Sequence, residues 1–509
     1  MCLYRHTLIM MAARKRVAIV GAGVAGLMSI KSCLEEDGLE PVCFERHDKL
    51  GGVWNYEPTL RPGQGSALYE SVVTNNSKEI LSFSDFPFPK EYPPFVSHRL
   101  VLRHIQNYAA HFNLEKHIRF NTNVIDVQRN NDGKYWKLQI KDKDDKLSTE
   151  EFDYVMICTS VYNKAIIPSY PGLENFSGTK IHANEYREAS TFKGKKVIVV
   201  GGSMSAGEIS SELARGGAEV YISMRHGVWI IPRMCQDGLP FDIALFRRTL
   251  FKSQSKLKEE IEKVCKTRMR DHQRFGLQSK EIYSIWKAFM ISDDMQDRLA
   301  QGQIKPMVDI KEFQKNDVIF QDGTTLESVD AVIFATGYGF GVPIINDSWL
   351  YDESGKAEVY KYVFPVRLEH PERLALISIC SPYGPHWPIG EIQARLASRV
   401  FAGNIALPDK AAMKREINQK RQYEKNKSCY VPGPPTVEEI AEMLGVKPSF
   451  WRLLLSDPKL AVAYEYGPMV PYWYRLQGPG AWPGARDRIL NAVENSTICL
   501  KGYPSLEEK

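Results

Sequence analysis

Short apolar runs recur along the chain and are followed by glycine-rich turns and helical stretches. The first run, Val17–Val20, leads into Gly21–Gly26, and a helical stretch extends from Leu27 to about Glu36. A short, continuously apolar run is typical of a strand buried on both faces of a parallel sheet. Pro41–Glu45 then predicts a second strand. The N-terminal region therefore predicts a strand, a turn, a helix and another strand.

The same order of elements returns far downstream. The run Lys196–Val200 leads into Gly201 and Gly202, and Ser205–Arg215 is predicted as a helix. Glu219–Met224 supplies the next strand. Strands that alternate with helices in this way are typical of an α/β fold with parallel sheets.

Two further apolar runs, Tyr154–Thr159 and Val332–Gly337, end in small residues. We interpret both as strands where the chain passes between two domains. The sequence therefore predicts an α/β fold of two Rossmann-like domains, one inserted into the other. The predicted parts are an outer domain of residues 1–164 and 333–509, an inserted domain of residues 165–332, and a charged, amphipathic, helical insertion at about 240–299 that could form a lid or a partner surface.

The composition narrows the class of protein. The 509 residues are 43% apolar, and the net charge of +5 arises from 66 basic and 61 acidic residues without strong clustering, so no nucleic-acid partner is predicted. The nine cysteines form no C-x-x-C pair and no metal-ligand spacing. This argues against a disulfide scaffold and a metal site, and it favours a reducing compartment. No apolar run reaches roughly 18 residues, so no transmembrane helix is predicted.

The first glycine-rich turn fits the pattern G-x-G-x-x-G. Its residues are Gly21, Ala22, Gly23, Val24, Ala25 and Gly26. Gly21 would make the tight turn, Gly23 would let a pyrophosphate approach the backbone, and Gly26 would allow close helix packing. The helix that follows would offer free N–H groups to the phosphates. Glu45 lies 19 residues beyond Gly26, at the end of the next strand, where a ribose hydroxyl needs an acceptor. A dinucleotide site is therefore preferred over a purely structural turn.

A paired glycine stands shortly after this strand, in Gly51-Gly52-Val53-Trp54. By itself the segment could be a turn beside a core aromatic residue. Its place after an acidic strand end resembles the second flavin contact of FAD-binding oxidoreductases. This favours FAD over NAD in the first site.

The second glycine-rich turn is a degenerate version of the first. It reads Gly201-Gly202-Ser203-Met204-Ser205-Ala206-Gly207-Glu208, so Ser203 and Ala206 replace two of the glycines. The strand that follows ends near Arg225 and carries no acidic residue there. A guanidinium at this position can bind a 2′-phosphate, which favours NADP over NAD. The alternatives are a surface arginine and, given the two replacements, a nucleotide-binding protein without catalytic activity.

Five further motifs resemble those of the flavin-containing monooxygenases of the animal, dimethylaniline N-oxide-forming type. They are Phe176–Tyr186, which matches F-x-G-x-x-x-H-x-x-x-Y, and the segments Val73–Glu79, Ser84–Pro87, Phe334–Tyr338 and Gly478–Arg486. The resemblance extends from about Lys15 to Asn491. It implies an NADPH- and O2-dependent flavoprotein that oxygenates soft nitrogen and sulfur nucleophiles through a C4a-hydroperoxyflavin.

The resemblance also implies roles for individual residues. The implied FAD contacts are Gly21 to Gly26, Glu45, Gly52, Val53, Trp54, Asn75, Asn76 and Gln393. The implied NADP contacts are Thr74, Asn75, Gly201, Ser205, Ala206, Gly207, Glu208 and Arg225. Asn75 is the predicted catalytic residue, because its amide offers both a donor and an acceptor to the hydroperoxide and the nicotinamide. The alternative is that Asn75 and Asn76 only form a turn. His182 is expected to position the two domains.

Several other activities stay open at this point. A Baeyer–Villiger monooxygenase shares the flavin chemistry, although its motif usually carries tryptophan where this chain has Tyr186. A leaky NADPH oxidase would mainly release hydrogen peroxide. A disulfide reductase would need a closely spaced cysteine pair, which Cys33 and Cys43 do not provide.

The expected partners are a small amine or sulfide substrate and O2, and a homodimer is considered. Animal members of the family usually end in a hydrophobic membrane anchor, and this sequence stops before one. We therefore expect a cytoplasmic protein, or one peripheral to the cytosolic face of the endoplasmic reticulum through apolar helices around Phe241–Phe251.

Overall fold

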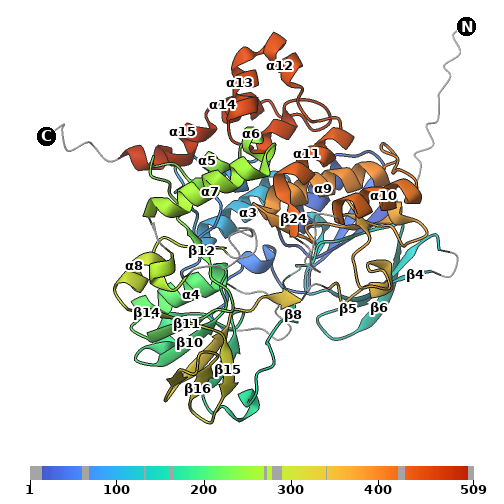
Figure 1. Ribbon diagram of the computed structural model, residues 1–509. Helices are drawn as coiled ribbons and strands as arrows, with labels where there is room; N and C mark the ends of the chain where they lie inside the picture. The colour runs from blue at the N-terminus through green and yellow to red at the C-terminus, as the bar shows by residue number, and fades with distance from the viewer. Residues whose placement is uncertain are drawn as a thin grey trace, which may run out of the picture.

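The chain forms two parallel sheets, each flanked by helices, as the computed structural model shows (Figure 1). The structure describes residues 14–59, 68–130, 133–160, 162, 164–268, 272–277, 289–339, 341–421 and 430–502. Part of the expected helical insertion, residues 269–271 and 278–288, lies outside this range. The predicted α/β class is confirmed.

The first sheet is built from both ends of the chain. Its strand order is β22-β7-β1-β2-β3, and every neighbouring pair is parallel. The strands are β1 (Lys15–Val20), β2 (Leu39–Phe44), β3 (Ile118–Arg119), β7 (Tyr154–Ile157) and β22 (Leu374–Leu376). Helix α1 (Val24–Leu34) follows β1 and packs against α9 (His386–Phe401). The order reverses between β1 and β7, which is the point where open parallel sheets bind nucleotides.

The second sheet repeats this plan with central residues of the chain. Its order is β14-β11-β10-β18-β9, again parallel throughout. The strands are β9 (Thr179–His182), β10 (Lys196–Val200), β11 (Glu219–Ser223), β14 (Ile304–Met307) and β18 (Ala331–Phe334). Helix α4 (Met204–Arg215) packs on β11. All of β18 belongs to this sheet, so the predicted domain boundary after residue 332 would divide this strand.

The two connections between the sheets run side by side. Strand β8 (Lys164–Ala165) leads toward the second sheet, β19 (Tyr338–Gly339) leads away from it, and the two pair in antiparallel fashion. Each sheet also carries a small antiparallel sheet. These are β4 (Asn123–Arg129), β5 (Trp136–Lys141) and β6 (Leu147–Phe152), and then β15 (Ile310–Phe313), β16 (Val318–Phe320) and β17 (Thr325–Leu326).

The segment expected to be a helical insertion contains a strand as well as helices. The helices are α5 (Phe241–Leu245), α6 (Arg248–Phe251), α7 (Gln254–Arg268) and α8 (Met295–Ala300). Strand β13 (Phe289–Ile291) pairs in parallel with β12 (Trp229–Ile231). The physical reason is that the apolar run of β13 is covered by α4, against which it packs.

The helices expected to contact a membrane face the interior instead. Phe241 and Leu245 are buried, and they pack with Ile231, Leu257 and Ile261 in one apolar cluster. The apolar residues of α5 therefore stabilise the insertion and present no surface to a lipid. No helix among the described residues is long and apolar enough to cross a membrane.

Helices α5 to α7 lie beside the C-terminal helices and away from the second sheet (Figure 1). The C-terminal helices are α10 (Lys410–Arg421), α11 (Gly433–Met443), α12 (Phe450–Ser456), α13 (Pro458–Tyr466), α14 (Ala485–Leu490) and α15 (Ala492–Thr497). Arg248 of α6 forms an ion pair of 2.8 Å with Glu438 of α11, and its guanidinium lies 3.7 Å from the ring centroid of Tyr464. These contacts join the central and C-terminal parts of the chain.

Candidate active site

The first glycine-rich turn has the close backbone packing that its sequence predicts. Gly21 adopts a φ of +103°, where a side chain would be strained. A Cβ on Gly26 would lie 1.8 Å from the carbonyl oxygen of Gly21, and a Cβ on Gly23 would point at the Cα of Gly52. The turn therefore requires glycine at positions 21 and 26, and glycine at position 23 leaves the backbone open to a phosphate.

The carboxylate of Glu45 is fixed next to this turn. Its Oε2 accepts a hydrogen bond of 2.7 Å from the Ala22 N–H, and its Oε1 accepts one of 2.9 Å from the His47 N–H. Each carboxylate oxygen retains a lone pair after these bonds. Glu45 therefore has the acceptor that a ribose hydroxyl needs, immediately after β2.

The segment Gly51–Trp54 closes over the same turn. The Gly51 N–H donates to the Ala22 carbonyl at 3.0 Å, and both Gly51 and Gly52 have positive φ. Residues Gly52–Trp54 form a 3-10 helix in which Val53 is exposed and Trp54 packs edge-on against Trp387. The arrangement fits a flavin dinucleotide held between two glycine segments.

Gln393 is buried and bonded to the protein backbone. Its side chain is 0% exposed, its Oε1 accepts from the Ser378 N–H at 2.9 Å, and its Nε2 donates to the Lys361 carbonyl at 3.5 Å. In this arrangement Gln393 holds the Ser378 turn, whose φ is +59°. A direct contact with a ligand would require a local rearrangement.

The second glycine-rich turn keeps a tight backbone geometry although its sequence is degenerate. Gly201 adopts a φ of +144°, and a Cβ there would lie 2.4 Å from the Ala335 carbonyl oxygen. Gly207 permits close packing of α4, since a Cβ on it would approach the Met290 sulfur to 2.7 Å. Ala206 is buried below the turn, whereas Ser203 and Ser205 are exposed on its rim. The two substitutions thus leave the tight turn and the helix packing intact.

Two polar groups flank this second turn. Arg225 is exposed two residues beyond β11, as expected for a group that binds a 2′-phosphate. Glu208, in the first turns of α4, lies 3.4 Å from the guanidinium of Arg233. The Glu208 carboxylate is therefore paired with the positive charge of Arg233.

The predicted catalytic residue lies in a turn, Thr74–Ser77, that touches both halves of the molecule. Thr74 is tied to Val96 by two hydrogen bonds of 2.9 Å. Asn75 Oδ1 accepts from Arg233 Nη2 at 3.0 Å, and Asn76 Nδ2 donates to Asp242 at 3.2 Å.

Sequence reasoning missed both of these partners, Arg233 and Asp242. Each lies more than 150 residues away from the turn, and no motif marks either of them. Residue type offered one weak signal, because each charged side chain stands among apolar residues, in Trp229–Cys235 and Phe241–Leu245.

His182 has the positioning contacts that were expected of it. Its side chain is buried, its Nε2 lies 3.0 Å from the Gly337 carbonyl, and its Nδ1 lies 3.0 Å from Asn184 Oδ1. The histidine of one motif thereby holds the connection that follows β18. Tyr186 of the same motif is buried against Tyr69.

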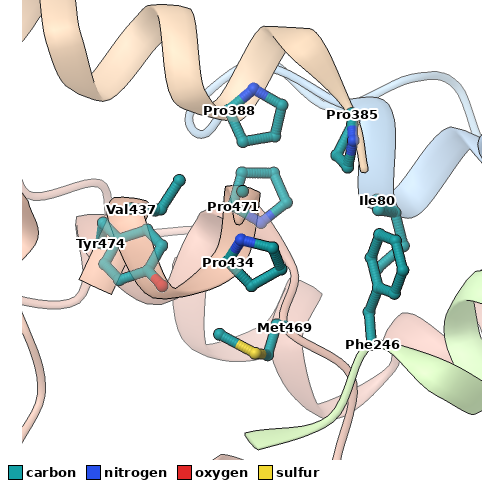
Figure 2. Close-up of a pocket in the computed structure, with 10 residues that line it drawn as sticks. Ile80, Phe246, Pro385, Pro388, Pro434, Val437, Met469, Pro471 and Tyr474 are labelled. Carbon is teal, nitrogen blue, oxygen red and sulfur yellow. The ribbon is translucent and has the colours of Figure 1, made fainter. Parts of the chain in front are cut away.

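An apolar pocket opens beyond the Thr74–Ser77 turn (Figure 2). Its cavity volume is about 30 Å³, which is room for water-sized molecules. Ile80 comes from α2 (Lys78–Leu81), directly after the turn, and Phe246 follows α5. The other lining residues include four prolines and a methionine, namely Pro385, Pro388, Pro434, Pro471 and Met469.

The chain is similar to known proteins along most of its length. Residues 14–504 match the model of the family described as "Flavin-binding monooxygenase-like". Flavin-containing monooxygenase 5 of Rattus norvegicus is 40% identical over 95% of this chain and 92% of its own length. Flavin-containing monooxygenase 2 of Homo sapiens is 39% identical over 96% of this chain and 93% of its own length.

Solved structures with the same fold are more distant in sequence. The S-allyl-L-cysteine S-oxygenase of Allium sativum aligns with a TM-score of 0.65 and 22% identity, over 96% of this chain and all of that one. A cyclohexanone monooxygenase aligns with a TM-score of 0.63 and 15% identity, over 85% of this chain and 98% of that one. The match along nearly the whole length shows that this chain belongs to the flavin-binding monooxygenase family, whose members use FAD and NADPH.

Proposed function

We propose that this flavoprotein monooxygenase oxygenates soft nitrogen and sulfur nucleophiles. In the overall reaction NADPH gives two electrons, one atom of O2 is bonded to the substrate, and the other leaves as water. The relatives support this substrate class, because one from Rattus norvegicus, 38% identical over 506 residues, is named a dimethylaniline monooxygenase [N-oxide-forming]. A bound flavin supplies the oxygen activation, and the protein supplies position and shielding.

One observation carries the proposal: the Asn75 amide is bonded to Arg233, and the same guanidinium lies 3.4 Å from Glu208 in the helix that follows the second glycine-rich turn. We assign FAD to the Gly21–Gly26 turn, Glu45 and the Gly52–Trp54 segment. We assign NADPH to Gly201, the exposed Ser205 and Arg225.

The chain's own residues would then act by position and by excluding water. Asn75 orients the reacting groups through hydrogen bonds at the junction of the two sites. The residues that line the proline-rich pocket give the region beyond the turn an apolar wall (Figure 2). Because an apolar wall disfavours an ammonium ion, it favours the neutral amine, whose nitrogen lone pair is free to react. Shielding from water also limits the loss of oxidant as hydrogen peroxide.

The test is a product balance on the purified yellow protein with NADPH and O2, using a thioether and a tertiary amine as separate substrates. We expect close to one sulfoxide or N-oxide for each NADPH consumed. Hydrogen peroxide as the main product would instead identify an NADPH oxidase. Esters formed only from ketones would identify a Baeyer–Villiger enzyme. No consumption of NADPH would identify a nucleotide-binding protein without this activity.

We also propose where a peripheral membrane contact would lie. Large apolar side chains are exposed on α12 and α13, among them Trp451 at 72% and Leu455 at 89%. Arg452 and Lys459 are exposed on the same two helices and would complement anionic lipids. A homodimer, considered from the sequence, is not tested by these contacts.

A further inference from the structure

Arg233 lies at the junction of the two candidate cofactor sites. It follows β12 and is almost fully buried. Its Nη2 donates to Asn75 Oδ1 at 3.0 Å, and its Nε donates to the Thr74 carbonyl at 3.4 Å. Its Nη1 lies 3.4 Å from both Glu208 and Asp293. One guanidinium therefore contacts the Thr74–Ser77 turn and the helix that follows the second glycine-rich turn.

These contacts determine which way the Asn75 amide points. A guanidinium has five N–H donors and no acceptor, so only the amide oxygen can face it. The hydrogen-bond network thus assigns Oδ1 to Arg233 and leaves the amide nitrogen as the group that faces away. Asn75 then turns its N–H donors toward the reacting groups, while its oxygen is bonded to Arg233.

A second charged group of the same half holds the other end of the turn. Asp242 is fully buried, and its Oδ2 accepts from the Ser77 N–H at 2.7 Å and from Asn76 Nδ2 at 3.2 Å. The Thr74–Ser77 turn is thus held by a cation at its start and by an anion at its end. Since these groups are buried, the loss of either one leaves polar atoms without a partner, which is costly.

We propose that Arg233 is a positioning residue that fixes the Asn75 amide with its N–H groups directed at the reacting groups, and that it links this orientation to the NADPH site through Glu208. The proposal rests on the function proposed above. Arg233 acts through Asn75. Loss of the Arg233 guanidinium therefore lets the Asn75 amide rotate, and NADPH is then consumed without oxygen transfer to the substrate.

The experiment compares Arg233→Met, Arg233→Lys and the control Arg215→Met in the flavin-loaded protein. Arg215 is an arginine of α4 in the same half, with an ion pair of 2.7 Å to Asp294, and it does not contact the turn. For Arg233→Met we expect the ratio of hydrogen peroxide to oxygenated product to rise about tenfold, the effect of one lost hydrogen bond to a charged group. Arg233→Lys keeps one donor and should recover part of the coupling, and Arg215→Met should match the parent.

A double substitution decides whether Arg233 acts through Asn75. If it does, adding Arg233→Met to Asn75→Ala changes the peroxide ratio little beyond Asn75→Ala alone. If the two substitutions raised the peroxide ratio independently, so that their effects multiplied, the proposal would be overturned. An Arg233→Met variant whose peroxide ratio matched that of the parent would also overturn it.

Hydrogen–deuterium exchange of the Thr74–Ser77 segment supplies a readout apart from turnover. Arg233→Met should speed exchange there, whereas Arg215→Met should not. Unchanged exchange would overturn the proposal. If the parent protein formed no oxygenated product, the proposed function would fail, while the exchange would still decide whether Arg233 holds the turn.

Discussion

Glu79 and Arg488, which are 409 residues apart in the sequence, form a two-point ion pair in the interior. Arg488 Nε donates to Glu79 Oε2 at 3.0 Å, and Nη2 donates to Oε1. The Tyr472 hydroxyl donates to the same carboxylate at 3.0 Å. Glu79 closely follows the Asn75 turn, and Arg488 belongs to α14. The pair therefore ties the C-terminal region to the helix that supports the candidate catalytic turn.

Glu79→Gln should destabilise the protein far more than loss of a surface ion pair. The substitution leaves the buried Arg488 without its counter-charge, which typically costs about 3–5 kcal/mol. The control is Glu494→Gln, whose ion pair with Lys501 is exposed and should contribute less than about 1 kcal/mol. Denaturant unfolding followed by tryptophan fluorescence measures both. Equal losses would show that the buried pair has no special role.

His104 should make the protein sensitive to acid. It is buried among Phe86, Phe88 and Trp387, and this burial lowers the pKa of His104 to about 3. An unperturbed histidine in the unfolded chain has a pKa near 6.5. Between these values only the unfolded chain binds the proton, so stability falls as the pH falls through this window.

The substitution His104→Phe keeps a ring in the aromatic cluster and removes this proton uptake. Relative to the parent, the variant should gain stability as the pH falls from 7 to 4.5, by up to about 2.5 kcal/mol. Unfolding at a series of pH values measures the difference. A difference that stays constant with pH would contradict the assignment.

The sequence was sufficient for the elements and contacts that depend on local order. The strand Lys196–Val200 has the predicted bounds, and the Gly21–Gly26 segment follows a strand as expected, although the helix begins at Val24 and not at the predicted Leu27. These features depend on the backbone conformation and burial of a few consecutive residues. Glycines and short apolar runs indicate both directly in the sequence. Membership in the flavoprotein monooxygenase family was also predicted correctly, because its motifs are spread along the chain.

Contacts between distant segments could not be predicted in this way. Neither the side chain of Arg233 nor that of Asp242 reveals in sequence which turn it contacts. The motif implies a flavin contact for Gln393, which stays a prediction, and it carries no sign that the amide is bonded to Ser378 and Lys361. The strand Phe289–Ile291 was read as helix because its sheet partner, Trp229–Ile231, is 60 residues away. Such features depend on tertiary packing, for which a single sequence carries no direct signal.

Gly26→Ala should abolish FAD binding. Its methyl group would overlap the Gly21 carbonyl, so the turn would have to open and lose the phosphate cradle. The control is Gly341→Ala, since a Cβ on Gly341 meets no atom within 4 Å. We expect the first variant to purify without the flavin absorbance and the second to stay yellow. Retention of a full complement of flavin by Gly26→Ala would place the FAD elsewhere.

Arg225→Ala should selectively weaken the use of NADPH. The loss of a charged hydrogen bond to the 2′-phosphate should raise the KM for NADPH by about tenfold or more. NADH lacks this phosphate, so its KM should not change, and it serves as the internal control. Steady-state kinetics with both cosubstrates measure the effect. An equal loss with NADH would mean that Arg225 supports the fold and does not bind the phosphate.

Removal of the exposed apolar side chains of α12 should weaken binding to lipid vesicles. Trp451 and Leu455 are four residues apart on one helix and are both largely exposed, so they can insert together into a bilayer surface. We expect the double variant Trp451→Ser, Leu455→Ser to lose at least about tenfold in affinity for vesicles of phosphatidylcholine with phosphatidylserine, measured by co-sedimentation. Leu147→Ser, on the exposed strand β6, is the matched control and should bind as the parent does. Because Arg452 and Lys459 would supply the electrostatic part, binding of the parent should also fall as salt is raised. A parent protein that does not bind these vesicles would remove the case for a membrane contact at this surface.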